Sequence, residues 1–215
     1  MSLSHPALSL FDSLPLAERL FVRARLFSAP LEELVAACPS GHVLDAGCGH
    51  GLVTAMLAAG DQRTVLGIDP DERKIQLARD SVGRLPNVGF RVATLEQLGE
   101  QSELDAVVVA DVLYLLPLEH WRSFLVAARR VLKRGGRLLL KEAEADGSWR
   151  HQKALWQEQL MVRVLGRTRD SGALGFQPRD VLESEVKTAG FRITRVAAFR
   201  SGYTTPHVLI DAEAV

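Results

Sequence analysis

The stretch 43–51 constrains the fold of this chain more than any other. A short apolar run, 42–46, carries an acid near its end, and an alternation of small and apolar residues, 52–59, follows. Between them stand three glycines on alternate positions: Gly47, Gly49 and Gly51. Glycine serves where the backbone must adopt positive φ or pass close to a ligand, and a helix that begins there directs free N–H groups at the loop. The pattern predicts strand, glycine turn and helix, with a ligand at the turn.

Two cofactor classes use such a turn. The dinucleotide fingerprint G-x-G-x-x-G needs a third glycine where this chain has Leu52. The spacing found here, with Asp45 two residues before the first glycine, resembles motif I of the class I S-adenosylmethionine (SAM)-dependent methyltransferases, D/E-x-G-x-G-x-G. The resemblance implies SAM as the cofactor. It implies a cofactor site that includes these motif residues: Asp45, Gly47, Cys48, Gly49 and Gly51.

A second acid follows the next apolar run, 64–69. Asp69 lies 20 residues past Gly49, and an acid at the end of the second strand of a nucleotide-binding α/β fold accepts hydrogen bonds from ribose hydroxyls. The alternative is an N-cap for the helix over 71–80, a role open to Asp69 or Asp71. With motif I beside it, ribose binding is favoured. The resemblance then places Pro70 beside the adenine.

Adenine recognition departs from the family pattern. A third strand is predicted over 87–93, after which the family often has an acid that accepts from the adenine amine. Here Thr94 and Leu95 stand instead. The resemblance therefore leaves the adenine to backbone groups or to the Thr94 hydroxyl.

The run 104–111 is apolar apart from Asp105 and its final acid, as in a central parallel strand buried on both faces. Ala110 and the D-V-L-x-x-L pattern that begins at Asp111 resemble the family's motif IV, which in the family lies beside the transferred methyl group. The version Asn-Pro-Pro-Tyr, which orients an amine of a base, is absent from this motif. Amine methylation of DNA is thus disfavoured.

The remaining elements complete the fold prediction. A helix from Pro117 to about Lys133 precedes a fifth strand over 136–141, and a helix from Pro178 stops at Gly190. Two strand-like runs, 191–200 and 206–212, close the chain. Alternating strands and helices predict an α/β doubly wound sheet. The resemblance implies a Rossmann-like, seven-stranded, mostly parallel sheet with an antiparallel C-terminal strand.

Two regions flank or interrupt this domain. Residues 1–38 are expected to be N-terminal helices, over 15–27 and 30–37, that cap the core, with 1–12 loosely ordered. Residues 39–215 form the SAM-binding domain, with an insertion at about 142–176 that combines an apolar stripe with a basic side. A cap that faces the core ranks first for this insertion, and peripheral contact with a membrane surface second.

Composition limits the classes of binding partner that can be expected. With 26 basic and 26 acidic residues the formal charge is zero, which gives no support to nucleic-acid binding. No apolar run reaches the roughly 18 residues of a membrane span. The two cysteines, Cys38 and Cys48, and the scattered histidines lack metal-ligand spacing, so neither a metal site nor a disulfide framework is predicted, and a cytoplasmic location is expected.

The resemblance implies in-line methyl transfer, with release of S-adenosylhomocysteine, and a small-molecule acceptor is expected. A general base is needed only for an acceptor that arrives protonated. Tyr114, beside motif IV, and His151, in the expected cap, are favoured over the other candidates, which are His50, His120, Tyr203 and His207. A non-catalytic SAM-binding or protein-binding module is the alternative. Acceptor atom and oligomeric state remain open.

Overall fold

The computed structural model describes residues 5–60, 62–99, 103–144, 177–199, 201–203 and 205–215. Its helices and 3-10 turns are η1 (Pro6–Phe11), α1 (Leu16–Ser28), α2 (Leu31–Ala37), α3 (Leu52–Leu57), α4 (Glu72–Ser81), η2 (Leu95–Leu98), η3 (Leu113–Leu115), α5 (Leu118–Val131) and α7 (Arg179–Thr188). Its strands are β1 (Gly41–Ala46), β2 (Arg63–Asp69), β3 (Val88–Val92), β4 (Leu104–Ala110), β5 (Leu132–Ala143), β6 (Phe191–Phe199) and β7 (His207–Ala214).

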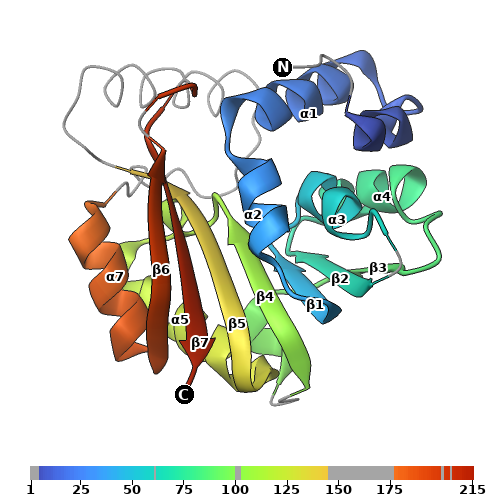
Figure 1. Ribbon diagram of the computed structural model, residues 1–215. Helices are drawn as coiled ribbons and strands as arrows, with labels where there is room; N and C mark the ends of the chain where they lie inside the picture. The colour runs from blue at the N-terminus through green and yellow to red at the C-terminus, as the bar shows by residue number, and fades with distance from the viewer. Residues whose placement is uncertain (1–4, 61, 100–102, 145–176, 200, 204) are drawn as a thin grey trace.

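The strands form one seven-stranded sheet in the order β3-β2-β1-β4-β5-β7-β6 (Figure 1). The pairs among β1 to β5 are parallel, whereas β7 runs antiparallel to both β5 and β6. This confirms the predicted doubly wound, mostly parallel α/β sheet with an antiparallel C-terminal strand. Strand order switches direction between β1 and β4, and ligands of such sheets bind at the carboxyl ends beside that switch.

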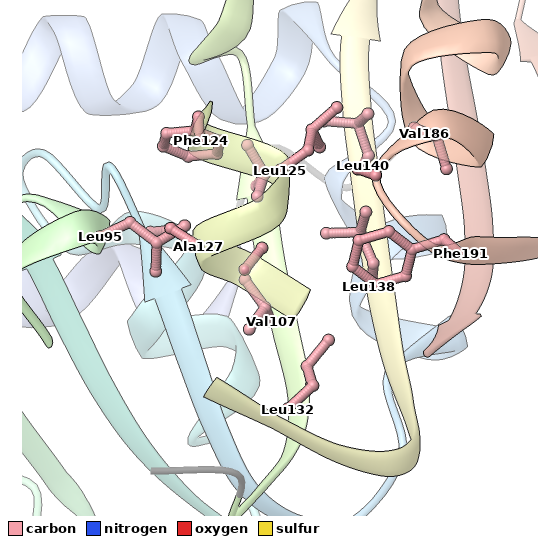
Figure 2. Close-up of a cluster of buried hydrophobic side chains, with 14 of the residues drawn as sticks. Leu95, Val107, Phe124, Leu125, Ala127, Leu132, Leu138, Leu140, Val186 and Phe191 are labelled. Carbon is pink, nitrogen blue, oxygen red and sulfur yellow. The ribbon is translucent and has the colours of Figure 1, made fainter. Parts of the chain in front are cut away.

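Alternating strand residues build two apolar layers, one on each face. Leu44, Val107 and Leu138 face α5 and α7, in the layer drawn in Figure 2. Val43 and Leu139 face the other way, toward η1 and the helices α1 to α3. Because both faces are covered, the central strands read as continuous apolar runs. No helix among the described residues is long and apolar enough to cross a bilayer.

One expectation needs correction. Residues 6–11, expected to be loose, form η1 and bury Phe11 to 2% exposure, because its ring packs into the layer beneath α1 and α3. β5 continues through Ala143, whose partner in β7 is His207, so this strand ends close to the expected start of the insertion at about 142. The remainder of the expected cap, 145–176, and His151 with it, lies outside the described residues.

Candidate functional site

The glycine loop after β1 is held by backbone hydrogen bonds from its neighbour β2. The N–H groups of Gly47 and Cys48 both donate to the Ile68 carbonyl, at 2.8 and 2.9 Å. All three motif glycines have positive φ, of 76°, 54° and 82°. A Cβ on Gly47 would stand 2.5 Å from Val112 Cγ2, whereas a Cβ on Gly49 would meet nothing within 4 Å. The loop therefore packs on one side and leaves a bare backbone cradle at Gly49.

Asp69 ends β2 beside this cradle. Its side chain is buried; Oδ2 accepts from Gly49 N at 3.0 Å and Oδ1 from Asp71 N at 2.9 Å. The N-cap of α4 is Asp71, whose carboxylate accepts from Arg73 N and Lys74 N. Because a carboxylate oxygen can accept two hydrogen bonds, each oxygen of Asp69 keeps one acceptor position beyond these contacts.

Other predicted cofactor residues are placed as follows. Asp45 is buried and accepts from Thr54 Oγ1 of α3 at 2.6 Å; burial raises its pKa to about 6. Cys48 is also buried in the loop, and burial raises the pKa of its thiol. The Asp45 carboxylate thus joins β1 to α3, beneath the glycine loop rather than on its open side.

The adenine candidates lie after β2 and β3. Pro70 is exposed. Thr94 begins η2, where its N–H donates to Gln97 Oε1 at 2.9 Å. The Leu95 side chain is 2% exposed and points into the apolar layer of Figure 2, so what Leu95 can offer a ligand is its backbone.

A buried ion pair joins the ends of β4 and β5. Asp111 has a φ of 59°, unusual outside glycine, and both its oxygens accept from Lys141 Nζ at 2.6 Å. Arg25 of α1 reaches the same point, at 3.2 Å from Asp111 Oδ2 and 2.7 Å from the Ala110 carbonyl. Burial opposes ionisation of Asp111, but the two cations hold its pKa below the ordinary value. Burial lowers the pKa of Lys141, and Asp111 offsets part of this.

Glu142 fixes the turn that follows Asp111. Its Oε1 accepts from both Val112 N and Leu113 N at 2.9 Å, and burial raises its pKa to about 8. The turn leads into η3, where Tyr114 is buried. Trp121 Nε1 of α5 donates to the Leu113 carbonyl at 2.7 Å. Hydrogen bonds from side chains of β5 and α5 therefore hold motif IV in place.

A third cluster fastens α1 to the glycine loop. Glu18, 2% exposed, lies 2.8 Å from His50 Nε2 and accepts from Arg73 Nη2 at 2.7 Å. The rings of Phe21 and His50 approach with centroids 5.3 Å apart. His50 thus helps to hold α1 over the glycine loop.

Sequence reasoning missed Glu18, Arg25, Lys141 and Glu142. A usable signal existed for the last two, since charged residues directly after the buried run 138–140 must be paired. Among the general-base candidates, His120 is exposed on α5 and Tyr203 donates to Glu33. His207 is buried at the start of β7. The glycine loop, Asp69 and Asp111 do come together at the carboxyl ends of β1, β2 and β4, as predicted.

Comparison with known proteins points to one family. Residues 43–136 match the family model described as "Methyltransferase domain". The chain is 35% identical over 100 residues to demethylmenaquinone methyltransferase of Tropheryma whipplei, covering 46% of this chain and 41% of that protein. It is 35% identical over 105 residues to the mitochondrial ubiquinone biosynthesis O-methyltransferase of Homo sapiens, covering 46% of this chain and 27% of that protein. The chain thus matches less than half the length of these relatives.

Solved structures extend the likeness to the whole fold. Geranyl diphosphate methyltransferase in complex with SAM superposes with a TM-score of 0.68 at 16% identity, over 96% of this chain and 94% of that one. Magnesium protoporphyrin IX methyltransferase from Synechocystis, with bound S-adenosylhomocysteine, gives 0.65 at 19% identity, over 96% and 91%. At these identities the likeness is one of fold.

Proposed function

We propose, from the premise that this chain belongs to the class I S-adenosylmethionine-dependent methyltransferases, that it transfers a methyl group from SAM to a small-molecule acceptor and releases S-adenosylhomocysteine. The observation that carries this proposal is the bare cradle at Gly49 beside the spare acceptor positions of Asp69. Glycines shape a surface for a ligand, and the carboxylate suits a pair of ribose hydroxyls.

The residues present fit the cofactor. The Gly47–Gly51 loop would lie against its methionine part and Asp69 would accept from its ribose, while Pro70, Thr94 and the Leu95 backbone would border the adenine. Ala110 and Asp111 would border the methyl end; the Asp111 carboxylate is occupied by Lys141 and Arg25, so its contribution there is to fix the turn. When bound, SAM supplies a methyl group on a sulfonium, which is a good leaving group.

The chain's own contribution is alignment and exclusion of water. Holding two reactants in near-attack geometry can lower a barrier by roughly 7–11 kcal/mol. The Lys141–Asp111 ion pair holds motif IV, and the Glu18–His50 contact holds the glycine loop. A small-molecule acceptor is supported by the neutral charge of the chain and by the names of its relatives.

Calorimetric titration with SAM, S-adenosylhomocysteine and NADH tests the cofactor. We expect binding of the first two alone; binding of NADH alone would refute the proposal. Turnover of any acceptor would exclude a non-catalytic binding module.

Asp69→Ala tests the layout. Loss of charged hydrogen bonds should weaken SAM binding by at most about 3 kcal/mol. Asp71→Ala is the matched control, because it removes only the N-cap of α4 and should leave SAM affinity unchanged. Unchanged affinity in Asp69→Ala would remove this residue from the ribose.

A further inference from the structure

His207 Nδ1 is a buried side-chain atom without a hydrogen-bond partner among the described residues, at the end of the sheet where β7 begins. Glu142 Oε2 and Glu144 Oε2 are also without such a partner, but they lie on the opposite face of the sheet, because His207 shares a face with its partner Ala143. Ala143 pairs with His207 across β5 and β7, and Glu144 N donates to the Pro206 carbonyl, so these residues are neighbours in the sheet. Each is 6% exposed or less. A buried polar atom is normally hydrogen-bonded, so His207 Nδ1 calls for a ligand that brings a donor.

The hydrogen bonds of His207 fix which ring nitrogen carries its proton. Nε2 lies 2.9 Å from the Ser28 carbonyl and 3.1 Å from Thr205 Oγ1. A carbonyl can only accept, so Nε2 bears the hydrogen. In the neutral ring Nδ1 then presents a bare lone pair.

The surroundings keep the ring neutral. Burial, followed by the nearby charges of Lys141 and Arg25, lowers the pKa of His207 to about 4, although Asp111 acts in the opposite direction. Tyr203 packs its ring edge-on against the imidazole, with centroids 5.7 Å apart. Nδ1 is therefore an acceptor at neutral pH, next to the turn that carries motif IV. Figure 1 shows α1 above this same end of the sheet, where β7 begins.

We propose that His207 is a catalytic base whose Nδ1 takes the proton of an acceptor hydroxyl, so that the substrate is a phenol, enol or alcohol and the product an O-methyl ether. This rests on the proposed function. The hydroxyl proton moves to Nδ1 and a lone pair of the oxygen forms the bond to the methyl carbon. The electron pair of the broken carbon–sulfur bond leaves with S-adenosylhomocysteine, and the proton passes from His207 to solvent.

A weakly basic imidazole suits this task. As the carbon–oxygen bond forms, the hydroxyl becomes far more acidic, so a base of low pKa can accept the proton late in the step. Lys141 and Arg25 also favour negative charge developing on the oxygen. An amine acceptor that arrives with a free lone pair would need no such base.

Two substitutions separate this role from a structural one. His207→Gln places an amide N–H where Nε2 stands and so can keep the bond to the Ser28 carbonyl, but it has no acceptor at Nδ1. His207→Asn places an oxygen near Nδ1 and loses the Ser28 bond. His120→Gln, on the exposed surface of α5, is the control. Calorimetry with SAM verifies that each variant is folded.

The first readout is the ring itself. In the full chain saturated with S-adenosylhomocysteine, ¹⁵N NMR should show His207 with a protonated Nε2 and a bare Nδ1 down to about pH 5. A proton on Nδ1, or a ring charged at pH 7, would overturn the proposal.

The second readout is turnover on a panel of phenols, enols and alcohols, each with its amine analogue. On the best hydroxyl acceptor, His207→Gln should lower kcat by about 10²- to 10⁴-fold. On a nitro-substituted form of that acceptor, already ionised at the assay pH, the loss should shrink to a few-fold. His207→Asn should also lower kcat, and its acceptor KM should change less than its kcat.

Three outcomes would overturn the proposal. They are equal losses on both acceptors, turnover of amines alone, and no turnover of any hydroxyl acceptor by protein that binds SAM. Failure to bind SAM at all would instead refute the proposed function.

Discussion

Gly49 combines two properties that a substitution can separate. Its φ of 54° disfavours any side chain, and its Cβ position opens onto space free of protein atoms within 4 Å. Gly49→Ala should therefore cost about 1 kcal/mol of folding free energy from backbone strain. If SAM occupies that space, the added methyl group should also weaken SAM binding at least about tenfold, or 1.4 kcal/mol. Calorimetry and urea unfolding measure the two effects.

Gly60 provides the matched control. It also has positive φ, 119°, and open space around its Cβ position, but it follows α3 near the amino end of β2, away from the proposed cofactor. Gly60→Ala should destabilise the chain and leave SAM affinity unchanged. Equal SAM affinities for the two variants would contradict the placement of the cofactor at Gly49.

Glu142 gives a pH dependence of stability. Burial raises its pKa from 4.5 to about 8 in the folded chain, so its contribution to stability is complete below pH 4.5 and is lost as pH rises through about 8. Glu142→Gln keeps an oxygen for Val112 N and Leu113 N but cannot ionise. The unfolding free energy of wild type should thus fall relative to Glu142→Gln between about pH 5 and pH 8.

Chemical denaturation across that pH range measures the difference. The exposed Glu119→Gln serves as the control and should run parallel to wild type. A difference between wild type and Glu142→Gln that stays constant with pH would mean that the carboxyl is not held protonated by the fold.

At the scale of elements, Arg63 ties the carboxyl ends of two helices to the sheet. From the start of β2 it donates to the carbonyls of Val35, Leu57, Pro39 and Cys38. The Val35 and Leu57 carbonyls lie in the last turns of α2 and α3, and those of Cys38 and Pro39 directly follow α2; the Val35 carbonyl also accepts from the N–H of the cap residue Cys38. Charged hydrogen bonds contribute about 1.5–3 kcal/mol, and Arg63→Ala should lose at least that amount.

Urea unfolding tests the role of Arg63. Arg63→Lys should lose less than Arg63→Ala but more than Arg79→Lys, because Arg79 makes one exposed bond, to the Phe90 carbonyl. SAM affinity should not change, since Arg63 lies at the amino end of β2. Wild-type stability in Arg63→Ala would mean that water caps these helices equally well.

The elements were predictable because their signals are local. Apolar runs, prolines and glycines marked every strand to within a few residues, except that β5 begins at Leu132 and ends at Ala143 rather than spanning 136–141. There the pairing with β7 continues past Lys141 over Glu142 and Ala143, and the charges of Lys141 and Glu142 mask the apolar pattern. Only the fold brings Asp111 to that strand end, where it pairs with Lys141, and buries the Glu142 carboxyl so that its pKa rises to about 8.

The same difference between local and long-range contacts separates the parts of the candidate site that could be predicted from those that could not. The glycine loop and Asp69 lie within one strand–turn–helix–strand unit, so their spacing in the sequence carries the geometry. The pairs Lys141–Asp111 and Glu18–His50 join elements 30 or more residues apart. His207 was one candidate among six because its distinguishing feature, the tether to Ser28, spans 179 positions. Such contacts leave no local pattern.

At the scale of the whole molecule, the packing of residues 1–38 indicates that they are part of the core rather than a separable cap. Phe11, Leu31 and Leu34 are at most 2% exposed and share a layer with Val43 and Leu57. Burying a large apolar side chain stabilises a fold by about 1.5–3 kcal/mol. Three such side chains therefore contribute an amount comparable to the total stability of many domains, about 5–15 kcal/mol.

We therefore expect that the fragment 39–215 does not fold cooperatively, even though it holds all seven strands. Its near-ultraviolet circular dichroism should be weak and its urea transition broad, because one face of the sheet keeps α3 but loses the cover that η1, α1 and α2 provide. A graded series in the full chain supports the reading: Leu31→Ala should cost about 2–5 kcal/mol, while Leu16→Ser, at a side chain 67% exposed on α1, should cost little. A sharp transition in the fragment, at the urea concentration of the full chain, would make residues 1–38 a separable cap.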